Sequence, residues 1–480
     1  MLEGLEISEI NYSFLNSVID FRIESEYFAK KFLIIDEILN NKNTISFTKI
    51  ATAINGRPYN SDSFNVIDGI KLSKIGDVTN KRNIEDWATV ATNEFEKQKG
   101  QFLTKGDILM TLTGDPPDIG KVNYIHSPIN SSWNQRVAKI KIASGTDYRN
   151  NESLFVVLST KYSRTQLERF AKGIRQRNLG NESLERLLLP ILSNSFQTIL
   201  KEIILKKYKL LESSKQTYTQ AENLLLEEIG LQDFTPSAAP VNIKSFKDSF
   251  GTSGRLDAEY YQVKYDVIEN TFDNFKRIKL KDLVNHPVSS GTTPKAGGSA
   301  YTNFEKGIPF IRAVDLKGGE VITSNFKYIK HNIHNGILKR TQLKKGDVLL
   351  SIAGTVGRSS IFSHNFEANI NQAVSILRFE ENKIKRLYLV AFFNSFIGKE
   401  FVSKFARQGV QTNLSLAEIG NLSIPIIDYK KQQQIAGLIE QSFSLKKQSE
   451  HLLEVAKKAV EIAIEENEEV ALQYIKQETK

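Results

Sequence analysis

Cysteine is absent from the sequence, and several other residue types are scarce. The 480 residues include no cysteine, 2 methionines, 2 tryptophans and 11 prolines. Without cysteine the chain has no disulfide framework, no thiolate metal site and no cysteine nucleophile. No apolar run approaches the roughly 18 residues that a transmembrane helix requires, and the N-terminus lacks a signal-peptide pattern. We therefore expect a cytoplasmic protein that does not associate with membranes.

Patterns that indicate catalysis are also scarce. Residues 115–118 are similar to the Pro-Pro box of amino-methyltransferases, but Asp118 stands where an aromatic ring would stack on the flipped base. We interpret this string as a loop. His331 and His334 lack a third ligand nearby, so we interpret them as solvated loop histidines rather than a metal site. Residues 354–360 lack the Gly-Lys-Ser/Thr ending of a phosphate loop, which makes nucleotide hydrolysis improbable.

The charge of the chain is moderately basic. The 64 lysines and arginines exceed the 55 acidic residues, which gives a net charge of +9. This excess favours a polyanion partner, and the alternative is that it serves only solubility. A hydrophobic content of 40% and a charged content of 25% are ordinary for a soluble globular protein. The length suggests two to four domains.

Most motifs of the sequence occur twice. The two copies lie about 235 to 240 residues apart, and this offset drifts slowly along the chain. Such a long period indicates a tandem pair of whole domains rather than a solenoid, whose repeats span roughly 20–50 residues. The repeated pairs include Lys105-Gly106-Asp107 with Lys345-Gly346-Asp347, Asn134-Gln135 with Asn371-Gln372, Phe170-Ala171 with Phe405-Ala406, Asn178-Leu179 with Asn413-Leu414, and Pro190-Ile191 with Pro425-Ile426.

Each half is predicted to have the same order of elements. Residues 45–145 and 278–380 alternate apolar and polar positions between turn signals, which predicts strands such as 137–142 and 348–353. A helical segment and then a proline stop follow in each half. The helical segments are 153–172 and 386–407.

A long helix is predicted after each proline stop, over about 195–229 and about 429–473. Each has one apolar stripe at three-four spacing, and a helix of ~35 residues would be roughly 50 Å long. A stripe of that length needs a partner along the helix, and the other long helix is the simplest candidate. The alternative is that each helix lies along its own domain.

Polar and basic side chains recur at the predicted turns of both halves. Arg, Lys, Asn and Gln are the side chains that hold DNA phosphates or read guanine and adenine edges. Asn134-Gln135 and Asn371-Gln372 could equally be buried turn anchors. The candidate DNA-contact residues are Arg57, Lys74, Lys121, Arg136, Arg175 and Arg177 in the first half, and Thr292, Lys295, Arg312, Arg358, Gln372, Gln411 and Asn413 in the second.

The chain resembles the specificity subunits of type I restriction–modification enzymes over nearly its whole length. The second half carries the clearest motifs, and the first half matches more loosely, with residues 56–58 and 70–74 in place of 290–294 and 307–312. The second-half motifs lie at 255–261, 290–294, 307–312, 345–351, 409–414, 424–425 and 430–436.

The resemblance implies a mixed α/β (α+β) fold with an internal pseudo-twofold repeat. Two tandem target-recognition domains would be separated and closed by two long helices, which would pair as an antiparallel coiled coil. The expected boundaries are 1–192 for the first domain, 193–230 for the central helix, 230–240 for the linker, 241–427 for the second domain and 428–480 for the C-terminal helix.

The same resemblance implies a DNA-binding subunit without catalytic activity of its own. Each domain would read one half of a split DNA site, and the helix pair would set the spacing and dock two methyltransferase subunits. In the restricting form, two translocase–nuclease subunits would join. S-adenosylmethionine, ATP and Mg would belong to these partners. The alternatives are a stand-alone DNA methyltransferase or nuclease with its own catalytic site, and a helical scaffold that binds proteins.

Overall fold

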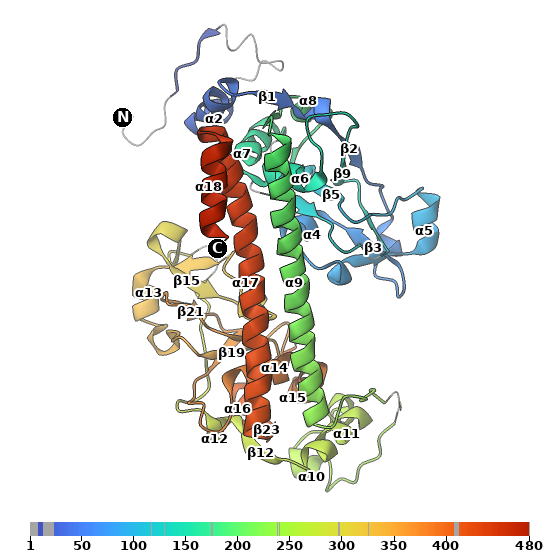
Figure 1. Ribbon diagram of the computed structural model, residues 1–480. Helices are drawn as coiled ribbons and strands as arrows, with labels where there is room; N and C mark the ends of the chain where they lie inside the picture. Colours follow the sequence, from blue (N-terminus) through green and yellow to red (C-terminus); the bar gives the residue numbers. More distant parts are fainter. Residues whose placement is uncertain are drawn as a thin grey trace. The chain divides into compact units, whose positions relative to one another are not determined.

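A computed structural model of the chain divides it into two compact units (Figure 1). Unit 1 comprises Met1–Glu212 and Lys446–Lys480, and unit 2 comprises Ser213–Leu445. Each long helix therefore contributes one half to each unit, whereas the expected boundaries set the helices apart as spacers. The structure describes residues 8–12, 24–116, 118–128, 130–173, 176–237, 239, 241–295, 298–324, 326–407 and 412–479.

Unit 1 is a mixed α/β unit, as expected. Its helices are η1 (Ser25–Phe28), α2 (Lys30–Asn40), α3 (Phe47–Ile50), η2 (Ser61–Ser63), α4 (Ile75–Thr79), η3 (Ile84–Asp86), α5 (Thr92–Lys97), α6 (Asn151–Ser159), α7 (Lys161–Phe170) and α8 (Asn181–Glu185), with the start of α9 (Asn194–Glu228), the end of α17 (Tyr429–Glu465) and α18 (Glu468–Glu478). Its strands are β1 (Thr44–Ser46), β2 (Ala51–Asn55), β3 (Ile70–Ser73), β4 (Ala88–Val90), β5 (Ile108–Thr111), β6 (Thr113–Gly114), β7 (Val122–Tyr124), β8 (Ser131–Trp133), β9 (Val137–Ile142), β10 (Arg177–Asn178) and β11 (Leu188–Pro190).

Two small sheets form the centre of unit 1. One has the antiparallel order β2-β9-β5-β7, and the other has the order β4-β3-β8, in which β3 and β8 are parallel. Every residue of β5 is buried, because the strand is central in its sheet and apolar on both faces. The main core joins this sheet to α6, α9 and α17. The pairs β1-β11 and β6-β10 complete the unit.

Unit 2 repeats this plan with different loops. Its helices are α10 (Phe250–Ser253), η4 (Ala258–Tyr261), α11 (Val263–Phe272), α12 (Leu280–Leu283), η5 (Phe304–Lys306), η6 (Ala313–Asp315), α13 (His331–Asn335), η7 (Lys339–Thr341), α14 (Arg386–Asn394), α15 (Phe396–Phe405) and α16 (Leu416–Asn421). Its strands are β12 (Lys276–Lys279), β13 (Ser289–Ser290), β14 (Tyr301–Thr302), β15 (Ile308–Ile311), β16 (Leu316–Lys317), β17 (Gly319–Val321), β18 (Lys327–Ile329), β19 (Val348–Ser351), β20 (Ser359–Ile361), β21 (Asn369–Ile370), β22 (Val374–Leu377) and β23 (Ser423–Ile426).

The two larger sheets of unit 2 have the orders β13-β22-β19-β20-β17-β16 and β14-β18-β15-β21, and β12 pairs with β23. The strand β19, which follows the second Lys-Gly-Asp turn, is again fully buried at the centre of its sheet. The parallel pair β15-β21 corresponds to β3-β8 of unit 1. The two units thus place the repeated sequence motifs in equivalent positions of their sheets.

Each predicted helical segment before the proline stop is two helices rather than one. Thr160 separates α6 from α7, and Ser395 separates α14 from α15. Each hydroxyl accepts a hydrogen bond from the backbone N–H three residues later, at 3.4 Å for Thr160 and 3.0 Å for Ser395. This capping satisfies an N–H group at the start of the second helix and ends the first.

The first long helix has nearly the predicted bounds, but the second is interrupted. Asn467 breaks it into α17 and α18, since its side chain accepts a hydrogen bond of 3.0 Å from the backbone of Val470. Lys42 then donates to the carbonyls of Glu465 and Glu466 at the end of α17. The prediction of one helix over about 429–473 was therefore wrong at its C-terminal end.

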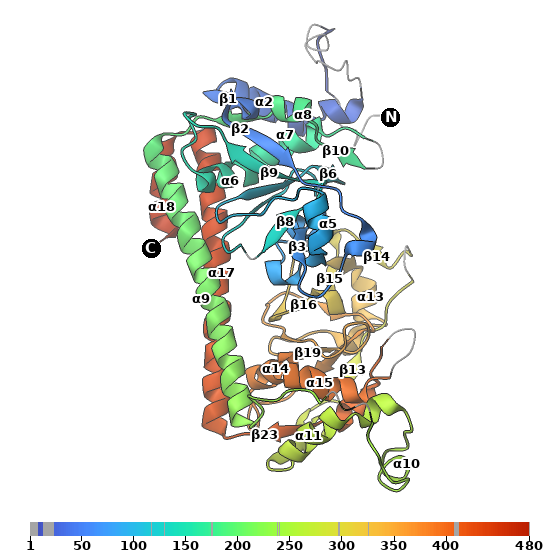
Figure 2. The same ribbon diagram turned by 90° about the vertical axis from the view of Figure 1, so that its right-hand side faces the viewer.

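The helices α9 and α17 pack against each other in each unit (Figures 1 and 2). In unit 2 they run antiparallel, because Ser214 contacts Ser442 while Glu228, further along α9, pairs with Lys431 at 2.6 Å. The Ser214 hydroxyl donates to the Ser442 carbonyl and the Ser442 hydroxyl to the Ser214 carbonyl, both at 2.8 Å. The two backbones therefore approach closely at these serines.

A buried glutamine connects each long helix to its own unit. Gln197 and Gln432 are fully buried, and each accepts a hydrogen bond of 2.9 Å from a backbone N–H, of Arg149 and Lys385 respectively. Their amide groups also donate to the carbonyls of Leu192 and Ile427 at 2.9 and 3.0 Å. This pair was not predicted from the sequence, although the glutamines stand at equivalent positions of the repeat.

Candidate nucleic-acid interface

Five separate segments of unit 1 meet through backbone hydrogen bonds. We call this meeting point junction 1 and define it as residues 56–58, 73–75, 112–114, 134–136 and 177–179. It brings together four of the six first-half candidates, namely Arg57, Lys74, Arg136 and Arg177. The bonds that join the segments run from Asn134 N to Ser73 O (3.1 Å), from Gln135 N to Arg57 O (3.1 Å), from Leu112 N to Arg136 O (3.0 Å), and from Leu179 N to Leu112 O (2.8 Å).

Unit 2 contains the same arrangement, which we call junction 2. It consists of residues 291–295, 311–313, 352–354, 371–373 and 412–414. Three of its four bonds use the same backbone atoms at equivalent positions, and in the fourth a threonine hydroxyl takes the place of the Arg57 carbonyl. They run from Asn371 N to Ile311 O (3.0 Å), from Gln372 N to Thr293 Oγ1 (3.5 Å), from Ile352 N to Ala373 O (2.8 Å), and from Leu414 N to Ile352 O (2.9 Å).

A glycine permits the closest approach in each junction. A Cβ atom on Gly56 would lie 2.2 Å from the Trp133 carbonyl oxygen, and one on Gly291 would lie 1.8 Å from the Ile370 carbonyl oxygen. No side chain fits at either position without movement of the backbone. The two glycines occupy equivalent places, although the sequences that follow them differ.

The asparagines of the repeated Asn-Gln pair anchor their turns. Asn134 accepts a hydrogen bond of 3.1 Å from the Arg136 N–H, and Asn371 accepts one of the same length from the Ala373 N–H. These are side chain–backbone turns that hold the backbone locally. The neighbouring Gln135 and Gln372 are exposed. The asparagines therefore act as turn anchors, whereas the glutamine side chains are exposed and can contact a ligand.

A backbone clamp lies beside each junction. The clamps are backbone pairs between Lys172 and Asn178 in unit 1 and between Arg407 and Asn413 in unit 2, with bonds of 2.8 to 3.3 Å. Between the clamp partners, residues 174–175 and 408–411 lie outside the described residues. Figure 2 shows β10, which contains Asn178 of the first clamp, and its partner β6 on the side of unit 1 away from α9. Arg175 and Gln411, two of the candidates, lie outside the described residues.

The repeated Lys-Gly-Asp turns precede β5 and β19, the strands that lead into the junctions. Gly106 and Gly346 have φ of +96° and +94°, which favours glycine. Asp107 and Asp347 each accept a backbone N–H at 2.7 Å across the turn. Each carboxylate also pairs with a cation, Lys139 on β9 at 3.4 Å or Arg378 directly after β22 at 2.6 Å. These aspartates are structural.

The described candidate residues differ in whether their side chains are half-buried or exposed. Three half-buried cations are held by carboxylates: Lys121 by Asp118 at 2.8 Å, Arg177 by Glu26 at 2.9 Å, and Arg312 by Asp315 at 2.9 and 3.0 Å. Lys74 is half-buried, and its ammonium lies 4.0 Å from the centre of the Phe64 ring. The exposed candidates are Arg57, Arg136, Thr292, Lys295, Gln372 and Asn413, and Arg358 is half-buried.

Asp77 and Asp315 were missed by the sequence analysis. Each is buried and accepts a hydrogen bond of 2.8 Å from the backbone N–H three residues earlier, at Lys74 or Arg312. Burial raises the pKa of Asp77, although the bond from Lys74 and the nearby Arg82 oppose it. The repeated basic-x-x-Asp spacing was the signal that could have identified them.

The histidines of α13 form no metal site. Within the described residues, no group of three or more His, Asp or Glu side chains could hold a metal ion. His334 is 2% exposed and contacts the Asn369 amide at 3.2 Å, and its burial lowers its pKa. Its interpretation as a solvated loop histidine was therefore wrong. The described helices also include none with the length and apolar character needed to cross a membrane.

Comparisons with known proteins agree on one family. Residues 273–455 match the type I restriction modification DNA specificity domain. The type I restriction enzyme EcoBI specificity subunit of Escherichia coli is 22% identical over 403 residues, which cover 83% of this chain and 79% of that protein.

Solved structures of two such subunits are also similar. The S subunit of M. genitalium is 13% identical, with a TM-score of 0.39 and coverage of 89% of this chain and 96% of that one. The HsdS subunit of Thermoanaerobacter tengcongensis is 13% identical, with a TM-score of 0.28 and coverage of 88% and 97%. Specificity subunits are non-catalytic, and other subunits supply the catalysis. Residues 273–455 therefore carry the type I restriction modification DNA specificity domain, and the chain as a whole is similar to the specificity subunits of type I restriction–modification enzymes.

Proposed function

We propose that each unit reads one half of a split DNA target through its junction. The observation that carries this proposal is that the two junctions share one backbone frame and differ in their side chains. Arg57 and Arg136 in junction 1 are replaced by Thr292 and Ala373 in junction 2, whereas the glutamine of the repeated Asn-Gln pair is the same in both. One frame with two sets of polar side chains suits two readers of different sequences.

The exposed and the held candidates would have different roles. Exposed Arg136 and Gln372 can reach base edges directly. Arg177 and Arg312 would first have to loosen their carboxylate partners, so we assign them to positioning the junction or to phosphate contacts. The proposed DNA-contact set remains Arg57, Lys74, Lys121, Arg136, Arg175, Arg177, Thr292, Lys295, Arg312, Arg358, Gln372, Gln411 and Asn413.

The helices α9 and α17 would hold the two readers at a fixed separation. The reciprocal bonds of Ser214 and Ser442 support this role, because they restrict sliding of one helix past the other. Two tethered readers bind a correctly spaced site more tightly than either reader alone. We further propose that two methyltransferase subunits dock on these helices, that two translocase–nuclease subunits join the restricting form, and that these partners bring S-adenosylmethionine, ATP and Mg in the cytoplasm.

The adenine-methylation pattern of cells that contain this gene tests the proposal. We expect a motif in two defined halves with a fixed gap, which disappears when the gene is deleted. The competing scaffold function predicts no such motif. It also predicts that the purified chain shows no salt-dependent retention on DNA.

Substitution of Arg136 by alanine is expected to relax reading of one half-site only. The cost is about 1–3 kcal/mol in binding if the guanidinium makes a bidentate base contact. The backbone bonds of Arg136 remain in the variant. Binding to a library of targets, randomised in each half separately, measures the effect.

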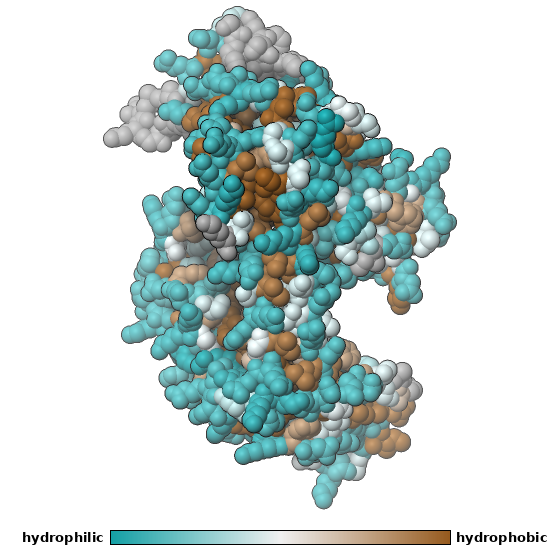
Figure 3. All heavy atoms as spheres, viewed as in Figure 1, coloured by the Kyte–Doolittle hydropathy of each residue, from teal (hydrophilic) through white to brown (hydrophobic). Residues whose placement is uncertain are grey.

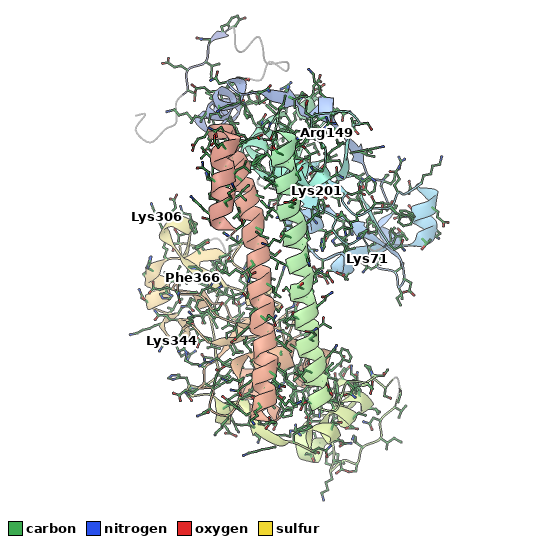
Figure 4. The ribbon with its side chains drawn as sticks, in the orientation of Figure 1. Lys71, Arg149, Lys201, Lys306, Lys344 and Phe366 are labelled. Atoms are coloured by element: carbon green, nitrogen blue, oxygen red, sulfur yellow. The ribbon has the colours of Figure 1, made fainter. Side chains whose placement is uncertain are left out.

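Two variants serve as controls for this experiment. Gln372→Ala should relax the other half-site, and Arg149→Ala, which removes an exposed arginine beside α9, should relax neither (Figure 4). Equal behaviour of Arg136→Ala and Arg149→Ala at every target would contradict the assignment of junction 1.

A further inference from the structure

Unit 2 carries a strongly basic segment outside junction 2. Residues 326–345 include six lysines and arginines and no acidic residue. We call them the basic corner. The equivalent stretch of unit 1, residues 86–105, contains three basic and three acidic residues and is neutral. The basic residues of the corner are Lys327, Lys330, Lys339, Arg340, Lys344 and Lys345.

The cations of the basic corner are exposed and unpaired. All six side chains are exposed, and none forms an ion pair with another described residue. Other basic residues of unit 2, such as Arg312, Arg378 and Lys385, are held by carboxylates. Figure 4 labels Lys344 and, on the same side of unit 2, the exposed Lys306. The surface around α13 is mainly hydrophilic (Figure 3).

A small hydrophobic core lies beneath the basic corner and fixes its position. Ile329 and Leu338 are buried with Ile308 and Phe310 in a small core beneath it. Lys327 lies on β18, which pairs with β15, and Lys339 and Arg340 lie in η7. The cations are therefore presented by ordered elements, which lowers the entropy lost when they bind a ligand.

The basic corner lies next to junction 2. The helix η7 contacts β13, the strand that leads directly into Gly291. The Thr341 hydroxyl bonds to the Asn369 side chain at 2.6 Å, and Asn369 begins the short strand that ends before the Asn371 turn. Two direct connections thus join the cations to the residues proposed to read DNA.

We propose that the basic corner binds DNA backbone phosphates that flank the half-site read by unit 2. This inference rests on the proposed function of junction 2. Phosphates are the ligands that exposed lysines without acidic neighbours recognise, and such contacts carry no sequence information. Five of the six cations are lysines, which act as point charges rather than as bidentate readers of bases. Unit 2 is then the stronger anchor on DNA, because the equivalent stretch of unit 1 is neutral.

The triple variant Lys327→Gln, Lys330→Gln and Lys344→Gln of the full chain tests this inference. Binding is measured on a target duplex and on an unrelated duplex over a series of salt concentrations. Each lost phosphate contact lowers the slope of log K against log salt by about 0.9, so we expect a fall of roughly 2 to 3. Affinity should fall by the same factor for both duplexes, and the recognised motif should not change.

A second triple variant distinguishes an effect of the basic corner from a general effect of net charge on DNA binding. Lys276→Gln, Lys279→Gln and Lys281→Gln remove three exposed lysines elsewhere in unit 2, on β12 and α12. Their salt slope should remain near that of the unchanged chain. Equal slopes in the two variants, or a changed motif in the first variant, would overturn the proposal. A chain without any preference for a two-part target would instead contradict the function proposed for the junctions, whatever its salt slope.

Discussion

Replacement of Arg378 by alanine is expected to destabilise unit 2 by about 3–5 kcal/mol, the usual cost when one partner of a buried ion pair is removed. Arg378 donates to both carboxylate oxygens of Asp347 at 2.6 Å, and the Asp347 side chain is only 2% exposed. Its guanidinium also donates to the Gln342 carbonyl at 3.0 Å. Without Arg378, the buried carboxylate keeps its turn bond but loses its counter-charge.

Chemical denaturation, with hydrogen exchange at the amides of β19 to locate the effect, measures this loss. Lys139→Ala is the matched control, since Lys139 holds the equivalent Asp107 by one longer contact of 3.4 Å, and the Asp107 side chain is 14% exposed. We expect it to cost about 1 kcal/mol or less. Because β19 leads into junction 2, Arg378→Ala should also weaken reading of the second half-site. A cost no greater than that of Lys139→Ala would contradict this account.

Replacement of Lys207 by methionine is expected to stabilise unit 1. Lys207 lies on α9 and is 8% exposed, with its ammonium 3.6 Å from the centre of the Tyr208 ring. Burial, and to a smaller extent the charge of Lys81, lowers the pKa of Lys207 to about 7, although Glu450 opposes the shift. Its counterpart in α17 is the small Ser442, which shows that the helix pair does not require a cation there.

The stabilisation should depend on pH with a defined sign. The unfolded chain holds a proton on this lysine up to about pH 10.5, whereas the folded chain releases it near pH 7. The unfolded state therefore binds more protons between these values, and stability rises with pH across that window. Each pKa unit corresponds to about 1.4 kcal/mol, so the penalty is about 4–5 kcal/mol below pH 7 and about 2 kcal/mol at pH 9.

Denaturation of the unchanged chain and of Lys207→Met at several pH values between 6 and 9 measures this dependence. Any effect of the methionine side chain itself is constant with pH and cancels in the comparison. Lys201→Met, on the exposed side of α9, should show no such trend (Figure 4). A difference between Lys207→Met and the unchanged chain that stays constant with pH would refute the prediction.

The sequence predicts the long elements well, because their periodicity extends over many residues. The apolar stripe over about 195–229 indicates the helix that the structure places at Asn194–Glu228. The strand β9 has the predicted bounds, and the mixed α/β class is confirmed. The breaks at Thr160, Ser395 and Asn467 were not predicted, since one capping side chain ends a helix while the apolar pattern continues.

The candidate site was predictable residue by residue but not as an arrangement. Glycine, asparagine and lysine in the sequence indicated the turns and the candidate residues on them. Only long-range backbone hydrogen bonds, however, bring residues 57, 74, 113, 135 and 177 together. The partners of Arg312 and Arg177 were also not assigned. Asp315 lies three residues from Arg312, and Glu26 lies far from Arg177 in the sequence. Charge partners of this kind depend on the fold, which turn propensity does not encode.

The clamps around residues 173–177 and 408–412 have an evolutionary consequence. They are made by amide and carbonyl groups of the main chain, which every residue except proline supplies in full. Substitutions between the clamp partners therefore leave these bonds intact. If the enclosed segments contact DNA as proposed, fold stability and binding preference can drift separately, and a lineage could acquire new targets by exchanging a few codons there while the remainder of the gene stays under purifying selection. The two segments of one chain can diverge independently in the same way.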